Sequence, residues 1–222
     1  MAQTAPEHRQ APSKPLQRRA VRTREVLLDT TEALAAAGGC DAVTTTRIAN
    51  ESGVSVGTIY RYFPNREALL LAAYDATVAR ITRHCVSHLQ TMEPMLDPEE
   101  AILSLIDCYL AAAEAIPAHA PLLREMQRLR PIADDRALDA SEMSEGILTP
   151  FLRRYGIGNA NLGPGHLAVV QTVMSTLVDL YLITECAEAR ANIRDDLLAY
   201  AMFAFSRLQK KRPRKSSGAL LE

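Results

Sequence analysis

The chain lacks the sequence patterns of several protein classes. No segment shows sustained alternation of polar and apolar residues, so we expect no β-sheet. No glycine-rich phosphate loop, nucleophile elbow, zinc signature or convincing carboxylate pair is present, so the usual marks of an enzyme are missing. We therefore predict an all-α protein with no catalytic residue, no cofactor and no bound metal.

Two further absences concern membranes and cysteine chemistry. The N-terminus has no apolar signal segment, and the most apolar stretch, residues 167–184, contains Gln171 and Asp179 and is a poor membrane span. The cysteines form no C-x-x-C pair and are expected to be small buried hydrophobic residues: Cys40, Cys85, Cys108 and Cys186. Unpaired cysteines of this kind are typical of a reducing compartment. We expect a cytoplasmic protein that has no membrane partner.

The composition allows a sizeable core and divides the chain by charge. The 222 residues are 48% hydrophobic, enough for one large or two small domains. Residues 1–66 contain nine Lys and Arg against six Asp and Glu, a net charge of +3, and the remainder carries −4. A basic front and an acidic back favour a DNA reader joined to a separate domain. Chance asymmetry in a nearly neutral chain is the alternative.

The segment that starts at Thr44 has the pattern of two short helices joined by a tight turn. Thr44 and Ser55 are suited to cap the two helices. Gly53 tolerates the positive φ that ends the first helix. Ile59 and Phe63 are four residues apart, so they share the helical face that docks into a core. This layout predicts a helix-turn-helix.

The other face of the second helix carries groups that suit DNA. Hydroxyls and arginine make most phosphate contacts. Val56 could contact a thymine methyl, Thr58 could reach either base type, and Gly57 permits close approach to the groove. The predicted contacts from this segment are Thr44, Thr45, Thr46, Arg47, Ser55, Val56, Gly57, Thr58, Tyr60, Arg61 and Tyr62. A merely solvated face in an all-α protein is the alternative.

This stretch closely resembles the DNA-binding domain of the TetR family of bacterial transcriptional regulators. The matching run extends from Val43 to Leu70, and a preceding helix over about 23–37 with Gly38-Gly39 after it also fits. The residues in the family's spacing are Ile48-Ala49, Gly53-Val54-Ser55, Gly57-Thr58-Ile59-Tyr60, Tyr62-Phe63 and Glu67-Ala68-Leu69-Leu70. The resemblance covers roughly the first third of the chain.

The resemblance implies a homodimer of nine or ten helices per chain. It implies an N-terminal three-helix helix-turn-helix domain that binds double-stranded operator DNA, and a C-terminal helical domain that binds a small-molecule effector and dimerises. It also implies phosphate or base-edge contacts for Tyr60 and Tyr62, and a phosphate contact for Arg66, where the family usually has lysine. Val56 stands at a position that is often polar in relatives, which leaves the operator sequence open. Repression is the family's usual mode, so we expect a repressor that its effector releases from a palindromic operator.

The expected domain boundaries follow from composition and helical periodicity. We predict a disordered basic tail at 1–20, the helix-turn-helix domain at 21–68, the effector-binding and dimerisation domain at 69–210, and a disordered tail at 211–222. The basic residues near the N-terminus could form an arm that enters a minor groove, or an ordinary soluble tail: Arg9, Lys14, Arg18, Arg19, Arg22 and Arg24.

Helices of the second domain are expected at about 70–88, 97–116, 122–129, 135–155, 164–187 and 191–209. The last two are apolar, and two from each chain would make a four-helix dimer interface. That interface would hold two recognition helices about 34–36 Å apart, one DNA turn.

A ligand cavity in such a protein lies between helices of the second domain. The candidate lining residues are Cys108, Tyr109, Met126, Met143, Phe151, Tyr155, Met174, Leu177, Asp179 and Tyr181. Ordinary core packing is the alternative for most of them. Asp179, a lone charge among apolar neighbours, could pair with a ligand amine, pair with an arginine across a dimer, or face solvent. Two rival functions remain open: a helical protein-interaction adaptor, and an all-α enzyme without sequence-specific DNA binding.

Overall fold

The computed structural model describes residues 14–130, 144–156 and 165–209. Within these ranges the regular elements are all helical, which confirms the predicted fold class, and nine of them are α-helices. The tail predicted at 211–222 and residues 1–13 of the tail predicted at 1–20 lie outside the described residues. The elements are α1 (Lys14–Gly38), η1 (Cys40–Ala42), α2 (Thr45–Ser52), α3 (Val56–Tyr62), α4 (Arg66–Thr91), α5 (Pro98–Glu114), α6 (His119–Leu129), η2 (Ser144–Leu148), α8 (Thr149–Arg154), α9 (His166–Ile183) and α10 (Ala187–Gln209).

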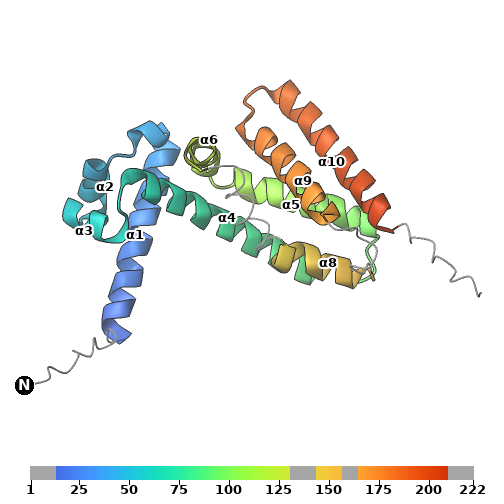
Figure 1. Cartoon of the computed structure of the whole chain (residues 1–222), viewed down its shortest axis with the longest axis horizontal. Coiled ribbons are helices and arrows are strands. Elements are labelled where there is room, and N and C mark those ends of the chain that lie inside the picture. Colours follow the sequence, from blue (N-terminus) through green and yellow to red (C-terminus); the bar gives the residue numbers. More distant parts are fainter. Residues whose placement is uncertain (1–13, 131–143, 157–164, 210–222) are drawn as a thin grey trace, which may run out of the picture.

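Helix α1 begins earlier than the sequence analysis expects. It starts at Lys14 rather than near residue 23, so the disordered tail predicted up to residue 20 is wrong for residues 14–20. The reason is local: Pro15 lies in the first helical turn, where proline is tolerated, and no glycine or proline follows until Gly38. Because Arg18 to Arg24 are helical, they are not part of an extended arm. The first half of α1 projects beyond α2 and α3 (Figure 1).

Helices α1, α2 and α3 enclose the core of the N-terminal domain. Leu27, Val43, Ile48 and Leu69 are fully buried there, and Ile59 is 1% exposed. Complete burial of one such side chain contributes roughly 1.5–3 kcal/mol to the stability of the folded chain. The apolar positions of the helix-turn-helix pattern therefore serve to hold α3 by one side.

Helix α4 is shared by both halves of the molecule. It packs against α1 of the N-terminal domain and against α5, α6 and η2 of the second domain. The predicted apolar stripe is buried over most of its length: Leu70, Tyr74, Val78, Ile81 and Cys85. Figure 1 shows α4 running from the α1–α3 end of the molecule to the end that contains α8.

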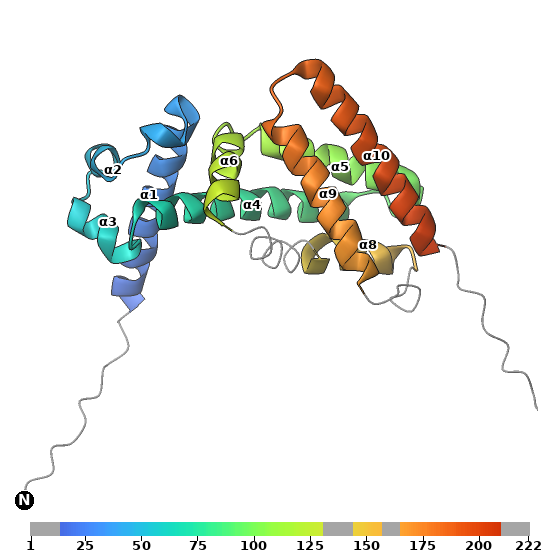
Figure 2. The same ribbon diagram turned by 45° about the horizontal axis from the view of Figure 1, so that its top comes forward.

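The remaining helices form the second domain. Helices α9 and α10 pack side by side, and both contact α5. Helix α6 stands between the N-terminal domain and α9 (Figure 2). Among the described residues no single helix is long and apolar enough to cross a membrane; α5 and α6 would reach that length together, but a bend of 93° separates them.

Candidate DNA interface and ligand cavity

The turn between α2 and α3 has the capping geometry that the sequence predicts. The Thr44 hydroxyl accepts a hydrogen bond from the Arg47 amide at 3.2 Å, and the Ser55 hydroxyl accepts one from the Thr58 amide at 3.2 Å. Gly53 ends α2 with φ of 69° and ψ of 18°, a left-handed conformation that other residues adopt at a cost. Local side-chain chemistry therefore sets the angle at which α3 leaves the turn.

Helix α3 has one buried and one exposed side. Ile59 and the following Phe63 are buried at 1% and 4% exposure, whereas Tyr60 is 51% exposed and Val56 is 37% exposed. A side chain added at Gly57 would meet only the Ser55 hydroxyl, at 3.9 Å, so the backbone of the first turn is open to an approaching surface. This side of α3 therefore offers the Tyr60 hydroxyl, the small apolar side chain of Val56 and the accessible backbone at Gly57, as a helix that reads a DNA groove requires.

The other predicted contacts surround α3 to differing extents. Thr44, Thr46, Arg47, Ser55 and Arg61 are exposed. The remaining predicted contacts are half-buried: Thr45, Thr58, Tyr62 and Arg66.

Three of these side chains already have partners within the domain. The Arg47 guanidinium donates to the Ala42 carbonyl at 3.2 Å and lies 3.7 Å from the Glu51 carboxylate. The Tyr62 ring packs against the core cluster and lies 5.4 Å beneath the Arg61 guanidinium. Of the two tyrosines, Tyr60 is therefore the more available to an external phosphate.

Arg66 requires a correction. Its guanidinium donates to the Val43 carbonyl at 2.6 Å and to the Cys40 carbonyl at 2.5 Å, and it lies 3.8 Å from the Glu125 carboxylate of α6. These donors point into the protein because the loop before α2 passes over the start of α4. Arg66 therefore anchors that loop, and the phosphate contact implied by the family resemblance does not fit its geometry.

A cavity of about 190 Å³ lies between α4, α5, α8, α9 and α10. Most of its walls are aliphatic or aromatic side chains, and Ile147 and Leu148 of η2 close one side. Tyr109, Phe151, Met174 and Asp179 line the cavity, as the sequence predicts for a ligand site.

The other candidate ligand residues do not line this cavity. Met126 and Leu177 pack in apolar clusters, and Cys108 lines a separate shallow groove beside His84 and His88. The Tyr155 hydroxyl donates to the Leu96 carbonyl, and the Tyr181 hydroxyl donates to the Glu114 carboxylate. Met143 lies outside the described residues.

Several lining residues were not predicted. Most of them are small or aliphatic side chains such as Val170, Ala201 and Ala204, whose types give no sign of a cavity. Gln171 also lines it, and its polarity within an apolar stretch is the one signal that could have identified it.

Helix α6 connects the cavity to the N-terminal domain. Toward that domain, the Pro121 carbonyl accepts a hydrogen bond from the Cys40 thiol, and Glu125 lies beside Arg66. Toward the second domain, the Gln127 amide donates to the cavity residue Asp179 at 3.5 Å.

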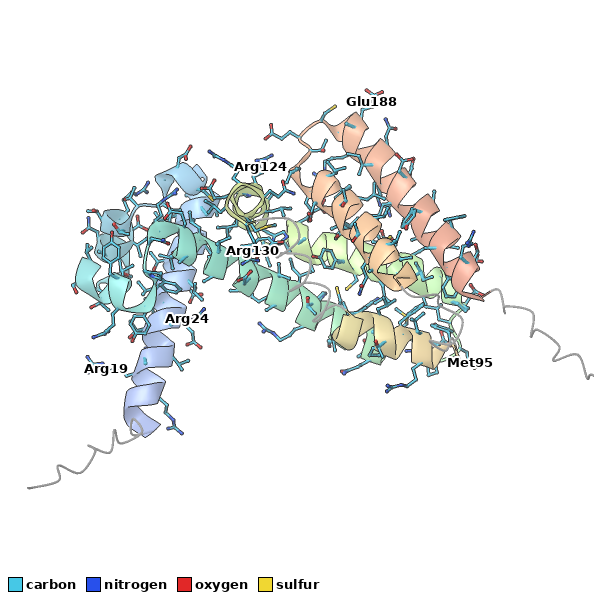
Figure 3. All side chains as sticks on the ribbon, in the orientation of Figure 1. Arg19, Arg24, Met95, Arg124, Arg130 and Glu188 are labelled. Atoms are coloured by element: carbon cyan, nitrogen blue, oxygen red, sulfur yellow. The ribbon has the colours of Figure 1, made fainter. Side chains whose placement is uncertain are left out.

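Arg124 adds a second link between α6 and the end of α9. Its guanidinium donates to the Ile183 carbonyl at 2.9 Å and to the Glu185 carboxylate at 2.8 Å. Figure 3 labels Arg124 beside α6. Helix α6 thus contacts both the end of α9 and, through Arg66, the loop that precedes α2.

The buried cysteines are poor candidates for redox chemistry, because a thiol reacts as its thiolate. Burial raises the pKa of the Cys85 thiol to about 12 and the pKa of the Cys40 thiol to about 11. The expectation of burial holds for Cys40 and Cys85, whereas Cys108 is half-buried and Cys186 is exposed. Because Cys186 lies in the short segment between α9 and α10, it is at the surface rather than in a core.

Comparison with known proteins places the strongest likeness in the N-terminal domain. The family model described as "Bacterial regulatory proteins, tetR family" matches residues 27–73. The chain is 43% identical over 58 residues to the HTH-type transcriptional repressor KstR of Mycobacterium tuberculosis, a match that covers 26% of each chain. It is 31% identical over 110 residues to the nucleoid occlusion factor SlmA of Haemophilus influenzae, which covers 48% of this chain and 50% of that protein.

The whole fold also has solved counterparts. A TetR-family transcriptional regulator from Streptomyces coelicolor superimposes with a TM-score of 0.62 at 19% identity, over 84% of this chain and 99% of that one. The sequence matches to the two curated relatives span only a quarter and a half of those proteins' own lengths. Sequence similarity thus centres on the helix-turn-helix, whereas the likeness of the second domain is one of fold.

Proposed function

Because the chain belongs to the TetR family of bacterial regulatory proteins, we propose that it is a sequence-specific DNA-binding transcriptional regulator. In this proposal it is a cytoplasmic repressor without enzymatic activity, and a small-molecule effector releases it from a palindromic operator. The observation that carries the proposal is the two-sided character of α3. Ile59 and Phe63 hold the helix by their burial in the core, while Val56 and Tyr60 are exposed to solvent.

The proposed DNA contacts fall into two groups. Thr44, Thr46, Ser55, Tyr60 and Arg61 carry hydroxyl or guanidinium groups at or near the surface of the domain and suit phosphate oxygens. Val56, Gly57 and Thr58 form the first turn of α3 and suit base edges in a major groove. The half-buried Thr45 and Tyr62 and the exposed Arg47 complete the proposed set.

We propose that two copies associate through α9 and α10. Large apolar side chains are exposed on both helices: Val169 is 57% exposed, Leu180 43% and Phe203 57%. Val169 and Leu180 are eleven residues apart, which is close to three helical turns, so they lie on one face of α9. Pairing these faces would make a four-helix interface and present two α3 helices to one DNA duplex.

Release from DNA would follow from a shift between two dimer geometries. An effector in the cavity contacts α9, and α9 contacts α6 through the Gln127–Asp179 and Arg124–Glu185 pairs. Helix α6 in turn contacts Arg66, which holds the loop before α2. In one geometry the two α3 helices match the spacing of the operator half-sites, and in the other they do not. The effector binds the second geometry more tightly and so lowers the occupancy of the operator.

Selection from a pool of random duplexes tests the proposal. The full-length protein is incubated with the pool at about 150 mM salt, which screens non-specific phosphate attraction, and the retained DNA is sequenced. We expect a palindrome whose half-site centres are about 34–36 Å apart. Retained DNA without a common motif would overturn the proposal and favour a protein-interaction adaptor.

A point substitution separates a DNA reader from the adaptor and enzyme alternatives. Replacing Tyr60 with phenylalanine removes one exposed hydroxyl, so a reader loses a phosphate contact and binds its selected duplex several-fold more weakly. Tyr155→Phe is the matched control, because that hydroxyl bonds to the Leu96 carbonyl in the second domain. Equal DNA affinity of the Tyr60→Phe variant and the unmodified protein would remove Tyr60 from the interface.

A further inference from the structure

One side of α9 places a row of polar residues along the otherwise apolar cavity. Gln171, Ser175 and Asp179 follow one another at intervals of four residues, and all three line the cavity. Residues four apart share one face of a helix, so the row forms a polar edge about 12 Å long. The facing walls are apolar side chains of α5, α8 and α10, among them Ile106, Phe151 and Ala204.

Gln171 differs from the other two residues of the row. The Ser175 hydroxyl donates to the Thr172 carbonyl at 3.1 Å, and the Asp179 carboxylate accepts from the Gln127 amide at 3.5 Å. The Gln171 side-chain nitrogen Nε2 is buried and has no hydrogen-bond partner within residues 14–130, 144–156 and 165–209. A buried donor without an acceptor is unfavourable, and a bound molecule that supplies an acceptor removes that cost.

The position of Gln171 assigns it to the cavity rather than to the proposed dimer face. The exposed face of α9 contains Val169 and Leu180, whereas the cavity row starts at Val170 and Gln171 and continues through Met174. A second copy seated on the exposed face would therefore leave the cavity row inside its own chain.

The size of the cavity limits the molecule that it can hold. An apolar cavity of about 150 Å³ in another protein binds benzene. The cavity of about 190 Å³ here is large enough for one six-membered ring with two or three further heavy atoms.

The charge of the lining disfavours acids. Among the described lining residues there is no lysine, arginine or histidine, and the Asp179 carboxylate is one of the walls. A carboxylate ligand would lose its hydration without gaining a counter-charge from these walls, which is strongly unfavourable.

We propose that the cavity binds an uncharged, mainly apolar molecule of about one ring in size, whose hydroxyl or carbonyl oxygen accepts a hydrogen bond from Gln171 Nε2. That this molecule is the effector rests on the proposed function, whereas its chemical class is inferred from the lining of the cavity alone. Gln171 is then the residue that distinguishes an oxygenated ligand from a hydrocarbon of the same shape.

Three probes of matched size test the proposal: benzyl alcohol, its hydrocarbon isostere ethylbenzene, and the anion benzoate. Their affinities for the full-length protein are measured from amide chemical-shift titrations, and the shifts of residues on α9 locate the site. We expect benzyl alcohol to bind and benzoate to bind at least tenfold more weakly. In the Gln171→Leu variant we expect the affinity ratio of alcohol to hydrocarbon to fall about tenfold, the effect of one hydrogen bond to a buried donor. Ethylbenzene should bind the variant at least as well as the unmodified protein, because leucine is similar in size to glutamine and is apolar.

The Ser175→Ala variant is the control, because its hydroxyl already bonds within α9 and the ratio should stay unchanged. An unchanged ratio in Gln171→Leu, or benzoate that binds as tightly as the alcohol, overturns the proposal. Absence of binding by all three probes overturns it too. Operator binding is measured on the same preparation by fluorescence anisotropy, so the two ideas fail separately. If the protein binds its operator but none of the probes, the proposed function stands and the proposed ligand class is wrong. If it binds the probes but no operator, the proposed ligand class stands and the proposed function is wrong.

Discussion

The Nδ1 nitrogen of His119 and the hydroxyl oxygen of Thr77 lie 2.7 Å apart in the interior, where α6 crosses α4. The Thr77 hydroxyl donates its single hydrogen to the Tyr74 carbonyl at 2.6 Å. It must therefore accept the hydrogen bond from His119, which fixes the neutral tautomer with the proton on Nδ1. The imidazole also stacks on the Tyr74 ring, with centroids 5.7 Å apart.

This arrangement predicts a pH dependence of stability. Burial, followed by the charge of Arg80, lowers the pKa of His119 from 6.5 to about 4. The unfolded chain therefore binds a proton below pH 6.5 that the folded chain does not bind until about pH 4. The free energy of unfolding should decrease as pH falls through this window, by up to about 1.4 kcal/mol per pH unit from this one group. Urea denaturation at several pH values measures that slope.

The His119→Gln variant isolates the contribution of this histidine. It should be less stable at neutral pH but should show a shallower slope between pH 6.5 and pH 4. His84→Gln, at an exposed position on α4, is the control and should keep the slope of the unmodified protein. Parallel curves for the His119→Gln variant and the unmodified protein would contradict the assignment.

Gly57→Ala should separate folding from DNA binding. An added methyl group meets no atom closer than 3.9 Å, so the change should raise the free energy of unfolding by up to about 1 kcal/mol, the difference in helix propensity. The same methyl group occupies the open first turn of α3 and should weaken binding to the selected duplex. Thermal unfolding and fluorescence anisotropy measure the two effects. Gly53→Ala is the contrasting control: at φ of 69° an added side chain should destabilise the domain. If the Gly57→Ala protein binds DNA as tightly as the unmodified protein, the α3 backbone does not approach the groove.

Arg66→Ala should act on stability. The change removes the donors to the Val43 and Cys40 carbonyls, so the free energy of unfolding should fall by about 1–3 kcal/mol. Arg61→Ala is the matched control: Arg61 is exposed, so its loss should leave urea stability within about 0.5 kcal/mol and weaken DNA binding. If Arg66→Ala kept full stability and lost DNA affinity, a phosphate contact would be the better assignment.

Charges on the proposed dimer face should separate the two copies. In the double variant Leu180→Glu with Phe203→Glu, like charges are placed where apolar side chains would be buried, so the mass measured by light scattering should shift from dimer to monomer. Met95→Glu is the control: Met95 is 89% exposed and lies between α4 and α5, outside the two helices of the proposed dimer face. A double variant that keeps the mass of the unmodified protein would exclude this face.

The helix-turn-helix could be predicted from sequence because its determinants are local. Thr44, Gly53 and Ser55 act on backbone groups within three or four residues, so their types and spacing contain the information. The predicted interruption between the two helices falls within two residues of the observed end of α2 and start of α3. The capping residue of α4, Asn65, was missed although its side chain accepts from the Ala68 amide in the same local way.

The role of Arg66 and the extent of the cavity could not be predicted in this manner. Arg66 bonds to a carbonyl 26 residues earlier, so its direction depends on how the loop before α2 crosses α4. Ala201 and Ala204 line the cavity because α10 packs beside α9, and alanine is equally common in closed cores. Met126 and Leu177 have the residue types expected of a ligand site but fill apolar clusters.

The continuity of α4 has a mechanical consequence. Cys85 at the cavity wall and Arg66 at the loop anchor belong to one uninterrupted helix, and their separation of nineteen positions spans about 29 Å. Over such an arm, a tilt of about 4° at the cavity moves the far end by about 2 Å. Two arms in a dimer would move in opposite senses and double that change in separation. Under the proposed function, a ligand no larger than a substituted ring would need to tilt α4 by only a few degrees to alter the fit of the two recognition helices, with no part of the protein unfolded.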